Sequence, residues 1–300
     1  MREPTQEEGT LLDVRHLTIG FPAEDGGRID VVRDVSFTVD AGETVALVGE
    51  SGCGKSVTAL SLARLIPSPP VSYPTGEVRF RGVDTLRLSR RDLQAVRGSG
   101  IAYVFQDPGT ALNPVFRIGF QLCEVLAGNR QQRREQALDL LAQVGLPASS
   151  FQAYPYELSG GMQQRVVIAL AIARHPVLLV ADEPTTALDV TIQAQILDLL
   201  KQLQQKLGMA VLLITHNLGL VADVAHRVNV MYAGMLVERG EAEVVLRHPA
   251  HPYARGLLDV VPRLERVTGR LSGIPGMVPA PGRLPSGCPF ADRCPHTAAR

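Results

Sequence analysis

The chain has 300 residues, 45% of them hydrophobic, a length and composition that allow one large globular domain or two modest ones. Its 30 basic and 30 acidic residues give a formal net charge of zero, which argues against nucleic-acid binding, because such proteins usually carry a basic face. Residues 1–10 have no apolar segment typical of a secretory signal, and the longest apolar run, VVIALAIA at 166–173, is too short to span a bilayer.

The N-terminal part of the chain is predicted to be rich in strands. Runs of apolar and β-branched residues predict strands over 11–21 and 31–39, separated by the turn-rich PAEDGGRID, and a further strand over 76–82. Between them, ETVALVG predicts a buried strand, and SVTALSLARLI predicts an amphipathic helix that ends before Pro67.

The rest of the chain first becomes helical and then alternates between helices and strands. A helical block over about 108–165 is predicted to form a subdomain. From about residue 160 the predicted elements are a helix to 174, a strand 177–182, a helix 190–207, a strand 210–215, a helix 218–225 and a strand 227–232. This alternation predicts an α/β fold with a largely parallel sheet covered by helices on both faces.

The segment VGESGCGKS at 48–56 has the spacing of a phosphate-binding loop, Gly49 followed by Gly54, Lys55 and Ser56. Glycines allow the backbone to turn its N–H groups toward an anion, and the following helix N-terminus adds to that site. Lys55 is one of three lysines in the chain and is predicted to reach the β- and γ-phosphates, while the Ser56 hydroxyl is predicted to ligate Mg²⁺. The predicted nucleotide-binding residues of this segment are Gly49, Glu50, Ser51, Gly52, Cys53, Gly54, Lys55, Ser56 and Val57.

The segment PVLLVADEP at 176–184 is an apolar strand that ends in two acidic residues. A carboxylate at the end of a buried strand beside a phosphate-binding loop is where a Walker-B Asp holds Mg²⁺, which predicts that role for Asp182. Glu183 is predicted to polarise the attacking water. A pair of helix-capping acids is the alternative interpretation, which Pro184 and the apolar strand argue against.

The segment LSGGMQQR at 158–165 predicts a second anion-binding helix start, because Ser159 can cap the helix while Gly160 and Gly161 expose backbone N–H groups. The helix that follows is apolar on nearly every face and is therefore predicted to be buried. Two such helix starts can serve one phosphate group only if they are brought together, within one chain or across two chains.

These motifs, in this order, resemble those of the ABC ATPases, and the resemblance covers residues 10–262. LSGGM, formed by Leu158, Ser159, Gly160, Gly161 and Met162, is similar to the signature motif of that family. YVFQDP with Gln106 resembles the Q-loop, TALD with Asp189 the D-loop, and LLITHN with His216 the switch histidine.

The resemblance implies a P-loop ATPase domain with antiparallel N-terminal strands and an inserted helical subdomain. It also implies that two such domains sandwich two ATP molecules, so that the signature of one domain completes the ATP site of the other. Gln106 is expected to sense Mg²⁺ and water, Glu183 and His216 to act in hydrolysis, and Phe21 to stack on adenine. A core position for Phe21 is the rival interpretation.

The C-terminal segment is rich in Pro and Gly, and RHPAHPYARGLLDVVP at 247–262 with GCPFADRCP resembles the tail of ATP-binding subunits of oligopeptide, dipeptide and nickel importers. We therefore expect an ABC domain over 10–262 and a tail over 263–300. The expected protein is a peripheral ATPase on the cytoplasmic face of the membrane, which energises the import of dipeptides, oligopeptides or a related solute such as nickel. Its expected partners are two permease subunits, a second ATP-binding subunit that is identical or homologous, and an external solute-binding protein. A packed helix start is the expected role of His251, Pro252 and Tyr253. A soluble regulatory ABC ATPase is the alternative.

The four cysteines are too scattered for a disulfide framework and indicate a reducing compartment. Cys288 and Cys294 match the start of a tail that carries four cysteines and an iron–sulfur cluster in some relatives. Two cysteines cannot complete a four-cysteine site, so we expect ATP and Mg²⁺ as cofactors and no cluster. A cluster or metal shared with another chain is the open alternative.

Overall fold

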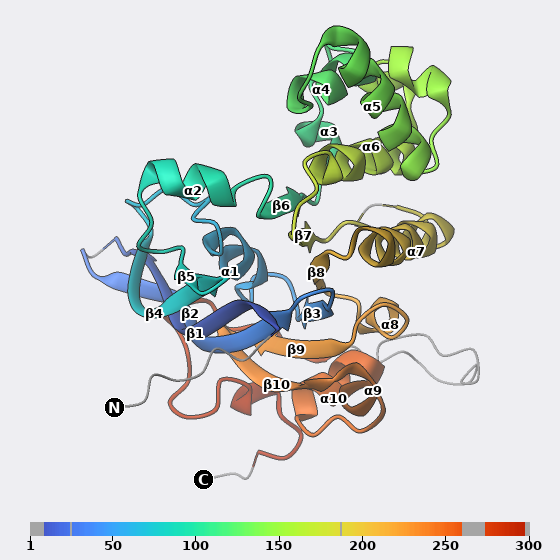
Figure 1. The fold of residues 1–300 in the computed structure, drawn as a ribbon. Coiled ribbons are helices and arrows are strands. Elements are labelled where there is room, and N and C mark those ends of the chain that lie inside the picture. Colours follow the sequence, from blue (N-terminus) through green and yellow to red (C-terminus); the bar gives the residue numbers. More distant parts are fainter. Residues whose placement is uncertain (1–8, 25, 187, 260–273, 298–300) are drawn as a thin grey trace. The chain divides into compact units, whose positions relative to one another are not determined.

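The computed structural model describes residues 9–24, 26–186, 188–259 and 274–297, and it divides into two compact units (Figure 1). The first unit combines residues 1–90 with residues 212–300, and the second comprises residues 91–211. Strand β8 (Ala210–Thr215) runs across the boundary between them, and helix α2 (Arg90–Val96) begins at the other boundary.

The strands of the first unit form an antiparallel sheet and part of a second, mixed sheet. The antiparallel sheet has the order β2-β1-β4-β5 and is built from β1 (Thr10–Pro22), β2 (Arg28–Asp40), β4 (Ser72–Phe80) and β5 (Val83–Asp84). In the other sheet, β3 (Thr44–Val48) pairs in parallel with β9 (Arg227–Tyr232), which pairs antiparallel with β10 (Met235–Glu241). All residues of β3 are buried, as expected for a parallel strand covered on both faces.

The helices of the first unit are short. They are α1 (Lys55–Ser61), α8 (Leu218–Val221), α9 (Ala242–Arg247), α10 (Pro252–Asp259) and the 3₁₀ turn η3 (Ala291–Arg293). Helices α8, α9 and α10 contribute buried residues to one apolar cluster with β3 and β9. The C-terminal tail joins this cluster through Phe290, which is 2% exposed, so the tail is part of the core of this unit.

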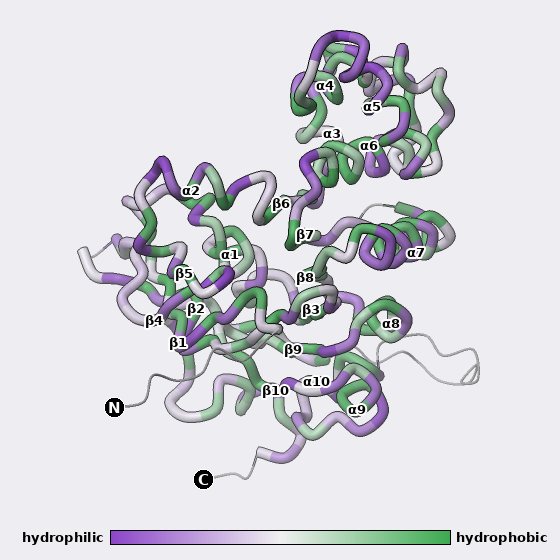
Figure 2. Tube along the Cα trace, viewed as in Figure 1, coloured by the Kyte–Doolittle hydropathy of each residue, from purple (hydrophilic) through white to green (hydrophobic). Residues whose placement is uncertain are grey.

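The second unit contains the parallel pair β6 (Ile101–Val104) and β7 (Leu178–Asp182) and most of the helices in Figure 1. Its helical elements are α2, α3 (Pro108–Ala111), α4 (Ile118–Val125), α5 (Arg130–Gln143), η1 (Ala148–Gln152), η2 (Pro155–Glu157), α6 (Gly160–Ile172) and α7 (Val190–Leu207). Helices α4 and α5 contact each other and α6. Helix α6 buries most of its apolar run, namely Val166, Val167, Ile168, Ala169 and Ile172, whereas Figure 2 shows both hydrophilic and hydrophobic residues along α7.

The α/β fold predicted from the sequence is confirmed, as are the bounds of α7, β8 and β9. Helix α1 is shorter than predicted and ends at Ser61. Arg64 adopts a left-handed conformation with a φ of 49°, which closes the end of a helix in the manner usual for glycine. Helix α8 is also shorter than predicted, and β10 was not predicted, because its residues are half-exposed and do not alternate.

None of the helices in the described parts of the chain combines 18 or more residues with the apolarity needed to cross a membrane.

Gly119 is a point of close packing within the second unit. It is buried in α4, and a Cβ atom there would lie 2.4 Å from Cε1 of the Phe151 ring. We expect Gly119→Ala to lower the free energy of unfolding by about 1–3 kcal/mol, because the ring must move out of a packed site. Chemical denaturation measures this effect. In the double variant, Phe151→Leu should restore part of the lost free energy of unfolding, because the smaller side chain makes room for the Cβ. If the losses of the two single variants simply add in the double variant, the two side chains do not conflict.

Candidate active site

The phosphate-binding loop lies between β3 and α1 in the first unit, as predicted from the sequence. Gly54 is the N-cap of α1 and has a φ of 105°, a conformation that residues with a Cβ rarely adopt. Its carbonyl accepts a hydrogen bond from Thr58 N at 2.9 Å, and the Cys53 carbonyl accepts one from Gly234 N at 2.9 Å. The loop is therefore attached both to its own helix and to the turn between β9 and β10.

The close approach of β9 requires a glycine at position 49. A Cβ atom at this position would lie 2.2 Å from the carbonyl oxygen of Met231, a distance at which the backbone itself would have to move. The absence of a side chain lets β3 end directly against β9 and lets the loop begin there.

Lys55 is buried inside the loop, with 5% of its surface exposed. Its Nζ donates to the carbonyl oxygens of Gly49 at 2.7 Å and Glu50 at 3.0 Å. The ammonium group is therefore held by the same loop whose amides are predicted to bind phosphate. A buried cation in this place favours an anionic ligand.

Glu50, the second residue of the loop, is held by two residues from distant parts of the chain. Its backbone N–H donates to the phenolic oxygen of Tyr253 at 2.7 Å. Its carboxylate forms two hydrogen bonds with Arg293, at 2.9 and 3.0 Å. Burial raises the pKa of the Tyr253 phenol, which keeps this group neutral. Sequence reasoning assigned Tyr253 only a packing role and did not consider Arg293, because their contacts to the loop span more than 200 residues.

Asp182 and Glu183 lie at the end of β7 in the second unit, together with the predicted Q-loop residue. The Glu183 carboxylate accepts hydrogen bonds from Gln106 Nε2 at 3.2 Å and Thr186 Oγ1 at 2.8 Å. The backbone of Glu183 has a φ of 48°, which costs a residue with a side chain about 1–3 kcal/mol and is typical of functional sites. The structure thus brings together two residues that the sequence placed in hydrolysis, Gln106 and Glu183.

The signature segment forms the start of α6 in the second unit. Ser159 is the N-cap, and its Oγ accepts a long hydrogen bond of 3.4 Å from Met162 N, in agreement with the predicted capping role. Ser159 and Gly160 are exposed, Leu158 is buried, and a Cβ at Gly161 would lie 2.7 Å from Ile192 of α7. The exposed helix start is therefore open to a ligand or a partner, while the second glycine packs inside the unit.

The remaining predicted residues lie at the ends of elements. Asp189 is the N-cap of α7, and its side chain makes no capping hydrogen bond. His216 is exposed directly after β8, in the first unit. Asn217 caps α8 by accepting a hydrogen bond from Gly219 N at 2.9 Å. Phe21 is half-buried near the end of β1, also in the first unit.

The predicted site residues are thus divided between the two units. Phe21, residues 49–57 and His216 belong to the first unit, and Gln106, residues 158–162, Asp182, Glu183 and Asp189 belong to the second. Among the described residues, no group of three or more His, Cys, Asp or Glu side chains is placed to hold a metal ion.

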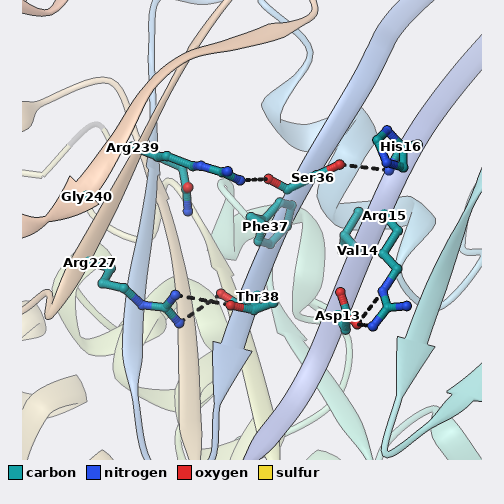
Figure 3. A pocket seen from close by; sticks show the side chains of 11 residues that line it. Asp13, Val14, Arg15, His16, Ser36, Phe37, Thr38, Arg227, Arg239 and Gly240 are labelled. Carbon is teal, nitrogen blue, oxygen red and sulfur yellow. Dashed lines mark hydrogen bonds and ion pairs between the residues drawn. The ribbon is translucent and has the colours of Figure 1, made fainter. Parts of the chain in front are cut away.

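A hollow of about 550 Å³ in the first unit is distinct from the phosphate-binding loop (Figure 3). It is lined by residues of β1, β2, β9 and β10, namely Asp13, Val14, Arg15, His16, Ser36, Phe37, Thr38, Arg227, Asn229, Arg239 and Gly240. Its arginines bind neighbouring groups: Arg227 donates to Thr38 Oγ1 at 3.1 Å, and Arg239 donates to the Ser36 carbonyl at 3.1 Å. These side chains hold the two sheets together, so we do not place the nucleotide here.

Comparisons with known proteins agree with the motifs. The chain matches the family model "ABC transporter" over residues 32–186 and the model "Oligopeptide/dipeptide transporter, C-terminal region" over residues 237–300. The fold and the phosphate-binding loop define a P-loop ATPase of the ABC type. The chain belongs to the ABC transporter family, as an ATP-binding protein.

Its relatives include the Dipeptide transport ATP-binding protein DppD of Escherichia coli (strain K12), which is 47% identical over 97% of this chain and 90% of its own length. The Oligopeptide transport ATP-binding protein OppD of Bacillus subtilis (strain 168) is 48% identical over 94% of this chain and 81% of its own. Among solved structures, the dimeric post-hydrolysis state of the ATP-binding cassette MJ0796 bound to ADP and Pi has a TM-score of 0.68. Its sequence is 27% identical, and the match covers 77% of this chain and 98% of the length of that cassette.

Cys53 provides a test of the loop geometry because its thiol is fully buried. Burial raises its pKa, against the opposing effect of the nearby Lys55 charge. The reactive thiolate should therefore form only at a pH above the ordinary cysteine range of ~8.5. We expect a bulky maleimide to label the exposed Cys288 first and to reach Cys53 slowly until the chain is unfolded.

Mass spectrometry of peptides from a labelling time course gives the order of modification, and Cys288→Ser is the control that removes the fast phase. Labelling of Cys53 at the rate of Cys288 in the folded protein would show that the loop is open.

Proposed function

We propose that this chain is the ATP-hydrolysing subunit of an ABC importer for dipeptides or oligopeptides. The observation that carries the proposal is the phosphate-binding loop with its buried Lys55, in a chain whose C-terminal region matches that of oligopeptide/dipeptide transporters. The relatives named above are peptide-transport ATP-binding proteins, and each aligns with nearly the whole length of this chain. Both relatives are named as transport proteins, which favours this function over that of a soluble regulatory ATPase.

The residues of the loop are suited to the phosphates of ATP. Gly49 lets the loop begin directly against β9, Gly54 starts α1 in a left-handed conformation, and Lys55 supplies a buried positive charge. We assign phosphate contacts to residues 49–57 and adenine stacking to Phe21. When bound, Mg²⁺ would neutralise charge on the β- and γ-phosphates, and Ser56, Asp182 and Gln106 are the residues that would hold it.

Glu183 is the proposed general base. Its carboxylate is oriented by Gln106 and Thr186, so it is held ready to accept a proton from a water molecule without first reorganising. Gln106 is proposed to sense Mg²⁺ and water, and its hydrogen bond couples it to Glu183. His216 is the proposed switch residue that responds to the γ-phosphate.

The proposed active form contains two ATP-binding subunits. Ser159 and Gly160 are exposed at the start of α6, where their helix terminus can receive the γ-phosphate of ATP held by another subunit. The whole proposed signature is Leu158, Ser159, Gly160, Gly161 and Met162, with Asp189 as the D-loop residue. The solved cassette MJ0796, which is similar in fold, is described as dimeric.

Two permease subunits are the proposed membrane partners, with an external solute-binding protein as an indirect partner and no nucleic acid. Apolar side chains are exposed between residues 105 and 125, including Val115 at 70%, Phe120 at 50% and Phe116 at 43%. The rings of Phe116 and Phe120 stack with their centroids 4.8 Å apart. Exposed aromatic groups of this kind mark protein contacts, so this segment would attach the subunit to the cytoplasmic face of the membrane.

In this proposal the ABC domain spans residues 10–262, with its helical subdomain over about 108–165, and the tail spans 263–300. Residues 260–273 lie outside the described part of the chain. Cys288 is exposed and Cys294 is half-buried, and the absence of an iron–sulfur cluster stays a prediction.

Glu183→Gln should lower ATP hydrolysis by about 10²–10⁴-fold, because the amide cannot accept the proton of the attacking water. Binding of ATP should survive, since Lys55 and the loop amides are unchanged. Unhydrolysed ATP should then hold two subunits together, and sedimentation with and without MgATP measures the resulting dimer, with this chain alone or with a homologous subunit.

Two further variants make this experiment specific. Adding Ser159→Arg should abolish the dimer, because it places bulk and charge at the exposed helix start, and Lys55→Ala should abolish it by weakening ATP binding. A Glu183→Gln protein that binds ATP and stays monomeric with each candidate partner would argue against the shared site.

Phe120→Glu should weaken attachment to the permease subunits by at least about tenfold, because a charge replaces an exposed aromatic contact. Co-purification of the subunit with membranes that contain the permeases measures this attachment. Val244→Glu is the matched control, because Val244 is 56% exposed on a helix of the other unit. Equal retention of both variants would refute the assignment of the 105–125 segment.

A further inference from the structure

The C-terminal tail reaches the phosphate-binding loop through one ion pair. The guanidinium group of Arg293 binds the carboxylate of Glu50 with both of its terminal nitrogens, at 2.9 and 3.0 Å. The two residues are separated by 243 positions, and both belong to the first unit. This two-point geometry fixes the orientation of both groups and is stronger than a single contact.

Arg293 is ordered by the tail and by the core, independently of Glu50. Its Nε donates to the Pro275 carbonyl at 2.8 Å, and one terminal nitrogen donates to the Ile274 carbonyl at 3.3 Å. The guanidinium carbon lies 5.7 Å from the centre of the Tyr232 ring and 5.9 Å from that of Phe290. The side chain of Arg293 is only 6% exposed, so its charge is held in place by contacts other than the one to the loop.

Glu50 presents an electrostatic conflict inside the loop. The neighbouring backbone and Lys55 form a site for the negative charge of phosphate, whereas the Glu50 carboxylate is itself negative. The main chain of Glu50 is held on both sides, by Tyr253 at its N–H and by Lys55 at its carbonyl, which fixes the point from which its side chain extends. A cation bound to the carboxylate reduces its repulsion of the phosphates.

We propose that Arg293 is a positioning residue of the ATP site, which neutralises Glu50 and holds its carboxylate away from the nucleotide phosphates. The proposal rests on the assignment of residues 49–57 to phosphate binding. It makes the tail segment 274–297 part of the ATP site, although it contains none of the motif residues. Docking of the tail then sets the affinity of the loop for ATP.

The test compares the affinity for MgATP of the full-length protein and three variants, Arg293→Gln, Glu50→Gln and the double variant, by titration calorimetry. Arg293→Gln should weaken binding about tenfold, because it leaves a partly buried carboxylate unpaired beside the phosphates. Glu50→Gln should bind at least as tightly as the parent, since the amide still accepts a hydrogen bond from Arg293 and carries no charge. The double variant should match Glu50→Gln within about threefold, because removal of the carboxylate removes the need for Arg293.

The charge mechanism also predicts how the loss depends on ligand, salt and side chain. The loss in Arg293→Gln should be largest for ATP, smaller for ADP and absent for adenosine, and it should shrink at high salt. Arg293→Lys should recover part of the affinity, since lysine keeps the charge but not the two-point contact. A purely structural role of Arg293 would leave the loss independent of salt and of the number of phosphates.

Each result bears on the proposal. A double variant as weak as Arg293→Gln, or an Arg293→Gln protein with the affinity of the parent, would overturn it. If Arg293→Gln fails to fold, as thermal unfolding would reveal, Glu50→Gln decides alone, because weaker binding in that variant contradicts neutralisation. Lys55→Ala tests the phosphate-loop assignment separately from the role of Arg293. Equal ATP binding by Lys55→Ala and the parent would refute that assignment, and the Arg293 proposal with it.

Discussion

The close approach of β9 to the phosphate-binding loop is the constraint on which the first unit depends. The carbonyl of Met231 occupies the space where a side chain of Gly49 would stand, and the next turn donates from Gly234 N to the carbonyl of Cys53. Gly234 is itself pressed against the backbone of β2, where a Cβ would lie 2.4 Å from the Val31 carbonyl. Glycine at two positions 185 residues apart therefore lets the backbone of β9 approach the start of the loop and the backbone of β2 approach the turn after β9.

The same region connects the loop with the C-terminal part of the chain. Tyr232, at the end of β9, packs against Tyr253 of α10 and Phe290 of the tail, with ring centres 4.6 and 5.2 Å away. Tyr253 accepts a hydrogen bond from the loop backbone, and Arg293 contacts both the aromatic cluster and Glu50. Apolar packing thus positions two polar contacts at the second residue of the loop, and the loop and the tail become one packed structure.

Several predictions from the sequence were correct because their signals are local. A continuous apolar run is enough to predict β8, and in β9 the apolar residues Val228 and Val230 alternate with polar ones, as in a strand. Gly208, with a φ of 64°, ends α7 where the sequence predicts its end. The errors have physical causes as well. Helix α1 stops early because Leu65 N bonds to the Leu60 carbonyl instead of continuing the helical pattern. Strand β10 was missed because pairing with β9, and not an apolar pattern of its own, creates it.

The sequence by itself determined the class of this protein, an ATPase of the ABC type. Gly49, Gly54 and Lys55 are predicted to bind phosphate because such a loop requires certain residue types at short, fixed spacings, and Glu183 is predicted from its place after an apolar strand. Only the tertiary structure showed that Gln106 bonds to Glu183, and that Tyr253 and Arg293 hold Glu50. Those contacts join residues 77, 203 and 243 positions apart, and no spacing rule applies over such distances. Only the packing of the β9, α10 and tail aromatic rings brings the last two to the loop.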